Sequence, residues 1–195
     1  MTRLTDACAK FDAFNAEDPN RVTVDGRSVP KELDYAQRMT HWLEKIAPQA
    51  SEALRLAARA QHIGRWTSPR SGYPMGKPGY LKWRRDLYAY HAEVAGRLMA
   101  DAGYDAASIA RVGVLLRKEN LKTDAEAQTL EDVACLVFLE NFYTEFSRRY
   151  DDDKVIDILR KTWKKMSPAA HAAALDLAQT LPPDRLRLIE RALAA

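Results

Sequence analysis

Apolar residues recur every three or four positions along nearly the whole chain, which is the spacing that one face of an α-helix shows. Prolines and glycines interrupt the pattern and mark the places where helices end. The spacing predicts helices over residues 3–18, 31–47, 49–66, 80–103, 105–119, 124–150, 153–166, 168–179 and 183–195. Strands do not alternate with these helices, so the pattern excludes a parallel α/β fold.

One stretch departs from the helical pattern. Residues 21–30 contain several β-branched residues around the pair Asp25-Gly26. An Asp-Gly pair suits the tight turn of a β-hairpin, and a short hairpin is one interpretation of this stretch. We expect an ordered loop there instead.

The length and composition bound the fold class. A chain of 195 residues can bury a hydrophobic core without disulfides or a structural metal. We therefore predict an all-α fold: a single compact multi-helix bundle in which residues 1–150 form the core and residues 151–195 are C-terminal helices packed on it. No apolar run approaches the ~20 residues that cross a bilayer, and the N-terminus lacks the apolar centre of a secretion signal. We expect a cytoplasmic protein without a membrane partner.

The middle of residues 59–85, here called the basic segment, breaks the helical pattern with prolines and glycines. From Arg55 to Arg85 the chain holds eight basic residues and no acid. Arginines bind phosphate or carboxylate, and flat aromatic rings stack on a base or cover an apolar group. A solvated basic surface without a ligand is the alternative. The predicted anion-binding residues are Arg65, Trp66, Arg70, Tyr73, Lys77, Tyr80 and Arg84, joined from a neighbouring helix by Lys118 and Lys122.

Two histidines lie where helices meet the basic segment. His62 lies at the end of the helix that leads into the irregular part of the segment, and His91 lies in the helix that follows that part. Further on, Asp132 lies in an apolar helix, where a carboxylate is costly unless it is paired or bound to a metal. These three residues are the candidate ligands for a divalent Mn, Fe or Zn ion, and a structural salt bridge is the alternative role for Asp132. Glu119 and Glu131 are the candidate general bases.

The order of these parts resembles the HD-domain superfamily of helical metal-dependent hydrolases. "LAARAQHIGRW" (residues 56–66) is similar to the phrase in which that superfamily carries its His-Asp pair, and "TLEDVACLVFLE" (residues 129–140) resembles its closing aspartate segment. The resemblance implies an HD-like bundle. Tyr35 and Gln61 stand where metal ligands are expected, so His91 and Asp132 match in type and His62 is a shifted candidate.

Nearly the whole chain is similar to a second group, domain of unknown function 4202. The phrases that carry this likeness are "AARAQHI", "YPMGKPGYLKWR", "LLRKENLK", "QTLEDVACLVFLE" and "IDILRKTWKKMS". Because the activity of that family is unassigned, this resemblance implies a fold and no reaction.

Three functions are consistent with these features. The first, implied by the superfamily resemblance, is metal-dependent hydrolysis of a phosphorylated small molecule or nucleotide held by the basic segment. The second is a non-catalytic module that binds a nucleotide, another anion or RNA. The third is a diiron oxygenase of the HD type. The apolar helix face in residues 151–167 would pack on the core or form a homodimer contact.

Overall fold

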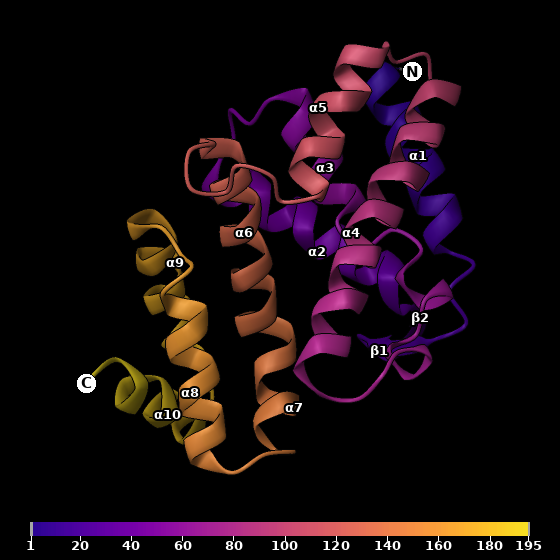
Figure 1. The fold of residues 1–195 in the computed structure, drawn as a ribbon. Helices are drawn as coiled ribbons and strands as arrows, with labels where there is room; N and C mark the ends of the chain where they lie inside the picture. The colour runs from indigo at the N-terminus through magenta and orange to yellow at the C-terminus, as the bar shows by residue number, and fades with distance from the viewer. Residues whose placement is uncertain (1, 195) are drawn as a thin grey trace.

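The computed structural model describes residues 2–194 and is almost entirely helical (Figure 1). The predicted all-α class is confirmed. The α-helices are α1 (Arg3–Asn15), α2 (Lys31–Ile46), α3 (Glu52–Ala60), α4 (Gly76–Asp101), α5 (Ala106–Leu116), α6 (Ala125–Val137), α7 (Tyr143–Ser147), α8 (Asp152–Trp163), α9 (Pro168–Ala178) and α10 (Pro183–Leu193). Two short 3-10 turns, η1 (Arg65–Thr67) and η2 (Arg70–Gly72), a π-helical turn, η3 (Phe138–Phe142), and two strands, β1 (Arg21–Val24) and β2 (Arg27–Pro30), complete the described chain.

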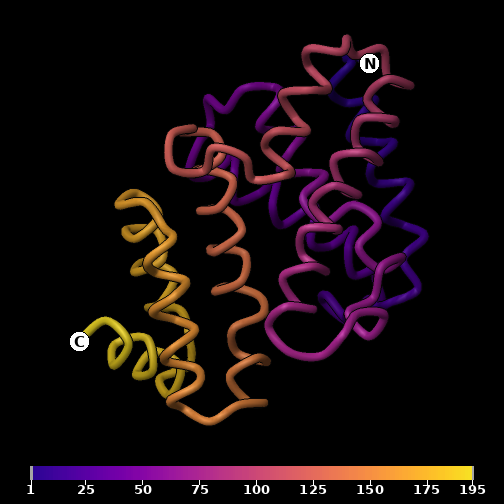
Figure 2. Tube along the Cα trace, viewed as in Figure 1, coloured from indigo at the N-terminus to yellow at the C-terminus, as the bar shows by residue number. Residues whose placement is uncertain are grey.

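Helices α6, η3 and α7 follow one another along one long path through the centre of the molecule, as the tube in Figure 2 shows. Helices α1 to α5 lie on one side of this path, and α8, α9 and α10 lie on the other. Helix α6 buries side chains nearly all round, including Leu130, Val133 and Leu136, as its continuous apolar run predicts. The C-terminal helices therefore pack against the helical core, as expected from the sequence.

Residues 21–30 form a hairpin, and the expectation of a loop there was wrong. Arg21 pairs with Pro30 and Val24 with Arg27 in an antiparallel register. Both turn residues take left-handed backbone angles, with φ of 48° at Asp25 and 75° at Gly26. These are the angles of a two-residue hairpin turn that matches the natural twist of the strands.

Helix α4 begins at Gly76, earlier than the predicted start at Tyr80. Pro78 lies in its first turn, where backbone N–H groups have no partner within the helix and a proline costs little. The preceding residues 70–75 fold back onto the helix. A Cβ on Gly79 would meet the Pro74 carbonyl oxygen at 1.9 Å, so only glycine allows this close approach.

Candidate functional site

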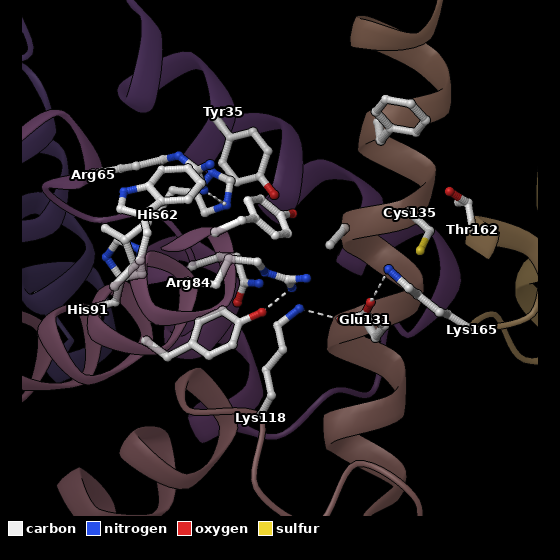
Figure 3. A pocket seen from close by; sticks show the side chains of 17 residues that line it. Tyr35, His62, Arg65, Arg84, His91, Lys118, Glu131, Cys135, Thr162 and Lys165 are labelled. Atoms are coloured by element: carbon white, nitrogen blue, oxygen red, sulfur yellow. Dashed lines mark hydrogen bonds and ion pairs between the residues drawn. The ribbon is translucent and has the colours of Figure 1, made fainter. Parts of the chain in front are cut away.

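A cavity of about 280 Å³ lies between the N-terminal helices and the path of α6 (Figure 3). Helices α2 and α4 and the end of α3 form one wall, while α6, η3 and the end of α8 form the other. The residues that line it are Tyr35, Gln61, His62, Arg65, Tyr80, Trp83, Arg84, Leu87, Tyr88, His91, Lys118, Glu131, Ala134, Cys135, Phe138, Thr162 and Lys165.

Positive charge dominates the cavity. Its lining holds four cations, Arg65, Arg84, Lys118 and Lys165, against one carboxylate, that of Glu131. Glu131 contacts Lys118 directly, and its Oε1 lies 3.8 Å from Lys165 Nζ. Burial raises the pKa of Glu131, but the neighbouring Lys118 outweighs this, so the pKa lies below its usual value and the carboxylate is charged. One carboxylate cannot neutralise four cations, so the lining carries a net positive charge.

Lys118 reaches the cavity from an unusual backbone conformation. It follows α5 with φ of 57°, in the left-handed region that side chains other than glycine rarely adopt. Its N–H donates to the Leu115 carbonyl and the next N–H, of Glu119, donates to Val114. This is the hydrogen-bond pattern that ends a helix at a left-handed residue, which is usually glycine. A lysine in that position is a local strain, and strain of this kind is concentrated at functional sites.

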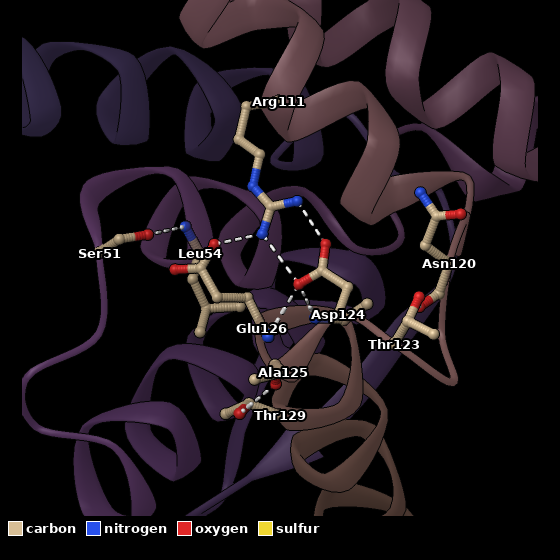
Figure 4. Close-up of polar contacts among 10 residues, drawn as sticks. Ser51, Leu54, Arg111, Asn120, Thr123, Asp124, Ala125, Glu126 and Thr129 are labelled. Carbon is tan, nitrogen blue, oxygen red and sulfur yellow. Dashed lines mark hydrogen bonds and ion pairs between the residues drawn. The ribbon is translucent and has the colours of Figure 1, made fainter.

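The connection that carries Lys118 is fixed to the helices around it (Figure 4). Asp124 caps α6 by accepting from the N–H groups of Glu126 and Ala127, at 3.0 and 3.3 Å. Arg111 of α5 donates to Asp124 Oδ1 at 3.0 Å and to Glu126 Oε2 at 2.5 Å. The Arg111 hydrogen bond lowers the pKa of Asp124 to about 2. The end of the connection at Asp124 is thus anchored to both α5 and α6.

Aromatic rings hold Arg84 in place on α4. Its guanidinium donates to the Tyr88 hydroxyl and lies 5.3 Å from the centre of the Tyr88 ring and 5.8 Å from that of Tyr80. Lys118 Nζ lies 5.6 Å from the same Tyr88 ring. Cations near aromatic faces are attracted by the ring quadrupole. Two of the four cations therefore converge on one tyrosine.

His62 is a neutral imidazole with both nitrogens engaged. Its Nε2 accepts from Arg65 Nη1 at 3.0 Å, so its proton lies on Nδ1, which is 3.4 Å from Glu32 Oε2. The Tyr35 ring stacks on the imidazole at 4.0 Å. Burial and the nearby Arg65 hold the pKa of His62 well below its usual 6.5, and burial raises that of Glu32.

His91 is also neutral. Its Nδ1 donates to the Ile63 carbonyl at 2.7 Å, which leaves Nε2 as an acceptor. Burial lowers its pKa to about 3. The His62 and His91 rings lie 6.0 Å apart, so the structure brings the two predicted histidines to the same cavity.

The third predicted metal ligand lies elsewhere. Asp132 is buried on α6, outside the cavity lining, and its Oδ1 accepts from Gln128 Nε2 at 2.9 Å and from the Ser167 N–H at 2.8 Å. In residues 2–194, no three His, Cys, Asp or Glu side chains are arranged to hold a metal ion. His62 Nε2 faces a guanidinium and the lining is strongly cationic. These residues do not fit the divalent ion that the superfamily resemblance implies.

Four of the nine predicted anion-binding residues reach the cavity, namely Arg65, Tyr80, Arg84 and Lys118. Arg70 instead donates to the carbonyls of Tyr73 and Pro74, at 2.9 and 2.8 Å, and so holds the turn before α4. Trp66 packs against Phe14, with ring centres 5.7 Å apart.

Four other predicted residues also lie outside the cavity lining. Lys77 and Lys122 are exposed to solvent. Glu119 is paired with Arg117, at 2.6 Å, so Glu131 is the predicted general base that faces the cavity. The side-chain hydroxyl of Tyr73 lies 3.4 Å from Ser68 Oγ within the turn before α4.

Several lining residues were not predicted as ligand-binding. Lys165 follows α8, over thirty residues beyond Glu131, and only the packing of α8 beside α6 brings it there. Trp83 and Tyr88 lie on the cavity face of α4, at helical spacing from the predicted Tyr80 and Arg84, and that spacing could have identified them. Tyr35 and Gln61 occupy positions where the resemblance implied metal ligands.

Comparisons with known proteins give a family and nothing further. The model of a family described as "Domain of unknown function (DUF4202)" matches residues 5–189. No curated protein and no solved structure matches the chain. The implied relationship to HD-domain hydrolases therefore stays a prediction. In residues 2–194, no helix is long and apolar enough to cross a membrane.

Proposed function

The chain belongs to the DUF4202 family, and we propose that it binds a phosphorylated small molecule in the cavity between α4 and α6. The excess of positive charge in the lining is the observation that carries this proposal. Arg84 and Lys118 lie together on one tyrosine, and arginine and lysine side chains bind phosphate through charge-assisted hydrogen bonds.

The size of the cavity suits a small ligand. Its volume of about 280 Å³ lies just below the range of roughly 300–1,000 Å³ in which proteins bind drug-sized molecules. A phosphate ester with a single ring or a short carbon skeleton would occupy such a space. The aromatic side chains of Tyr35, Trp83 and Phe138 would cover the organic part.

The proposal is for binding, the second of the functions expected from the sequence. Hydrolysis and oxygenation as the superfamily resemblance implies them depend on a metal ion. The arrangement around His62 and His91 does not favour one, because Arg65 donates to the first imidazole and Asp132 lies outside the lining. Glu131, bound to two lysines, is better placed to balance charge than to accept a proton.

Isothermal titration calorimetry with inorganic phosphate and AMP tests the proposal. Arg84→Gln removes a lining cation, and Arg85→Gln is the matched control, because Arg85 is exposed and lies outside the cavity. We expect Arg84→Gln to weaken binding at least about tenfold, since hydrogen bonds to charged groups contribute about 1.5–3 kcal/mol. We expect Arg85→Gln to bind as the unaltered protein does. The proposal fails if neither compound binds at millimolar concentration, or if both variants lose the same affinity.

A further inference from the structure

Gln61, a residue of the cavity wall, holds an unpaired acceptor. The side chain lines the cavity wall and is only 6% exposed, and its buried Oε1 has no hydrogen-bond partner in residues 2–194. Buried polar atoms in folded proteins are nearly always hydrogen-bonded, and each exception needs an explanation. An acceptor kept unpaired at the wall of a cavity is explained if a ligand supplies the missing donor.

A second acceptor faces the same space. His91 donates through Nδ1 to the Ile63 carbonyl, and its Nε2 forms no hydrogen bond within residues 2–194. Its ring is buried and neutral, so Nε2 can accept a hydrogen bond but cannot donate one. The cavity thus combines cations, which suit a phosphate, with two neutral acceptors, which suit hydroxyl groups.

The two lysines and the two imidazoles lie in different parts of the cavity. In Figure 3 the imidazoles of His62 and His91 lie on one side, and Lys118 and Lys165 extend toward Glu131 on the other. Gln61 is adjacent in sequence to His62, just beyond the end of α3. A ligand that spans the cavity would meet Lys118 and Lys165 at one end and the neutral acceptors, with Arg65 beside His62, at the other.

We infer that the ligand is the phosphate ester of a hydroxylated carbon skeleton, such as a ribose phosphate, either free or as part of a nucleotide. Its phosphate binds at Arg84 and Lys118, and its hydroxyl groups donate to Gln61 Oε1 and His91 Nε2. This inference rests on the proposed function and adds the chemical class of the organic part. Gln61 is a specificity-determining residue in this account, because it distinguishes a hydroxylated ester from a plain one.

Calorimetry with three phosphate esters tests the inference. Methyl phosphate has no hydroxyl on its carbon, ribose 5-phosphate has several, and AMP adds a base to the hydroxylated sugar. The variants are Gln61→Leu and Gln61→Met, which keep the approximate volume and remove the acceptor. Gln37→Leu is the matched control, because Gln37 is exposed on α2 and lies outside the cavity.

We expect the unaltered protein to bind ribose 5-phosphate or AMP at least tenfold more tightly than methyl phosphate. Either Gln61 variant should remove most of this preference and keep the affinity for methyl phosphate within about twofold of that of the unaltered protein. Gln37→Leu should keep the affinities for all three ligands within about twofold. If AMP binds most tightly, the ligand is a nucleotide. If AMP and ribose 5-phosphate bind equally, the ligand is the sugar phosphate.

The melting temperature without ligand checks that the variants fold, and we expect it to hold or rise, because both remove an unpaired buried acceptor. The inference is overturned if methyl phosphate binds as tightly as ribose 5-phosphate and AMP, or if the Gln61 variants weaken all three ligands equally. If no phosphate compound binds at all, the proposed function itself fails, which is a distinct result.

Discussion

Lys118 of the connection after α5 forms an ion pair with Glu131 of α6 inside the cavity, and both side chains are largely buried. Glu131 is the carboxylate of the lining, and it also lies 3.8 Å from Lys165. A phosphate that binds Lys118 must compete with this carboxylate. The ion pair thus balances part of the charge of the cavity and opposes anion binding.

Glu131→Gln should therefore tighten the binding of inorganic phosphate, by roughly tenfold if one charged contact is freed. The same change should lower the free energy of unfolding, because it leaves Lys118 partly buried without its counterion. Titration calorimetry and urea unfolding measure the two effects. Weaker phosphate binding in this variant would show that Glu131 contributes to the site in another way.

A pair of substitutions separates the side chain of Lys118 from its backbone. Lys118→Ala and Lys118→Gly both remove the ammonium group and should lose phosphate binding to the same extent. Glycine also tolerates the left-handed conformation at φ of 57°, so the Lys118→Gly variant should be more stable than the Lys118→Ala variant by about 1 kcal/mol. Urea unfolding gives the stability difference. Equal stabilities would mean that the backbone at this position is not strained.

The two neutral histidines make stability depend on pH in a defined direction. The pKa of His91 falls from about 6.5 to about 3 on folding, so below pH 6.5 the unfolded chain binds a proton that the folded chain does not. The contribution of His91 is fully present above pH 6.5 and is lost as pH falls toward 3, at up to about 1.4 kcal/mol per pH unit. His62 acts in the same sense, whereas Glu32, whose pKa is raised, acts in the opposite one.

His91→Asn isolates this contribution, because an amide can still donate to the Ile63 carbonyl. Urea unfolding between pH 7 and pH 4 should show a shallower loss of stability in the variant. Parallel curves for the two proteins would contradict a neutral, buried His91.

Gly79 allows residues 70–75 to pack against α4. In Gly79→Ala the new Cβ would overlap the Pro74 carbonyl oxygen, and the turn would have to move. We expect a loss of stability of about 1–3 kcal/mol, as for other overpacked positions. We also expect weaker phosphate binding, because Tyr80 and Arg84 lie on the same helix just beyond Gly79. Gly72→Ala is the control, since a Cβ there meets no atom within 4 Å. Melting temperatures compare the two, and similar values would contradict this packing.

Most helices were predictable because their apolar spacing and their ends are local properties of the sequence. Asp105 and Asp124, for example, begin the predicted helices 105–119 and 124–150, and each caps the helix that follows it. The hairpin at residues 21–30 was predicted as a loop because four-residue strands carry little periodicity, although Asp25-Gly26 marked its turn. The predicted start of α4 was too late, because proline and glycine, as at Pro78 and Gly79, indicate a break in a helix unless they lie in its first turn.

The site was only partly predictable, because long-range packing decides which cations face it. Arg70 and Arg84 look alike in the sequence, yet the first binds backbone carbonyls and the second lines the cavity. Nothing local to Lys165 links it to Glu131, more than thirty residues earlier. The three candidate metal ligands do not lie together for the same reason, because the Asp132 carboxylate accepts from the Ser167 N–H outside the cavity lining.

A crystal structure of the protein grown with ribose 5-phosphate tests the central claim most directly. The account predicts density for the phosphate in the cavity, with its oxygens within hydrogen-bond distance of Arg84 and Lys118, and with Lys118 drawn from Glu131. An empty cavity and an intact ion pair between Lys118 and Glu131, in a crystal grown with saturating ligand, would contradict it.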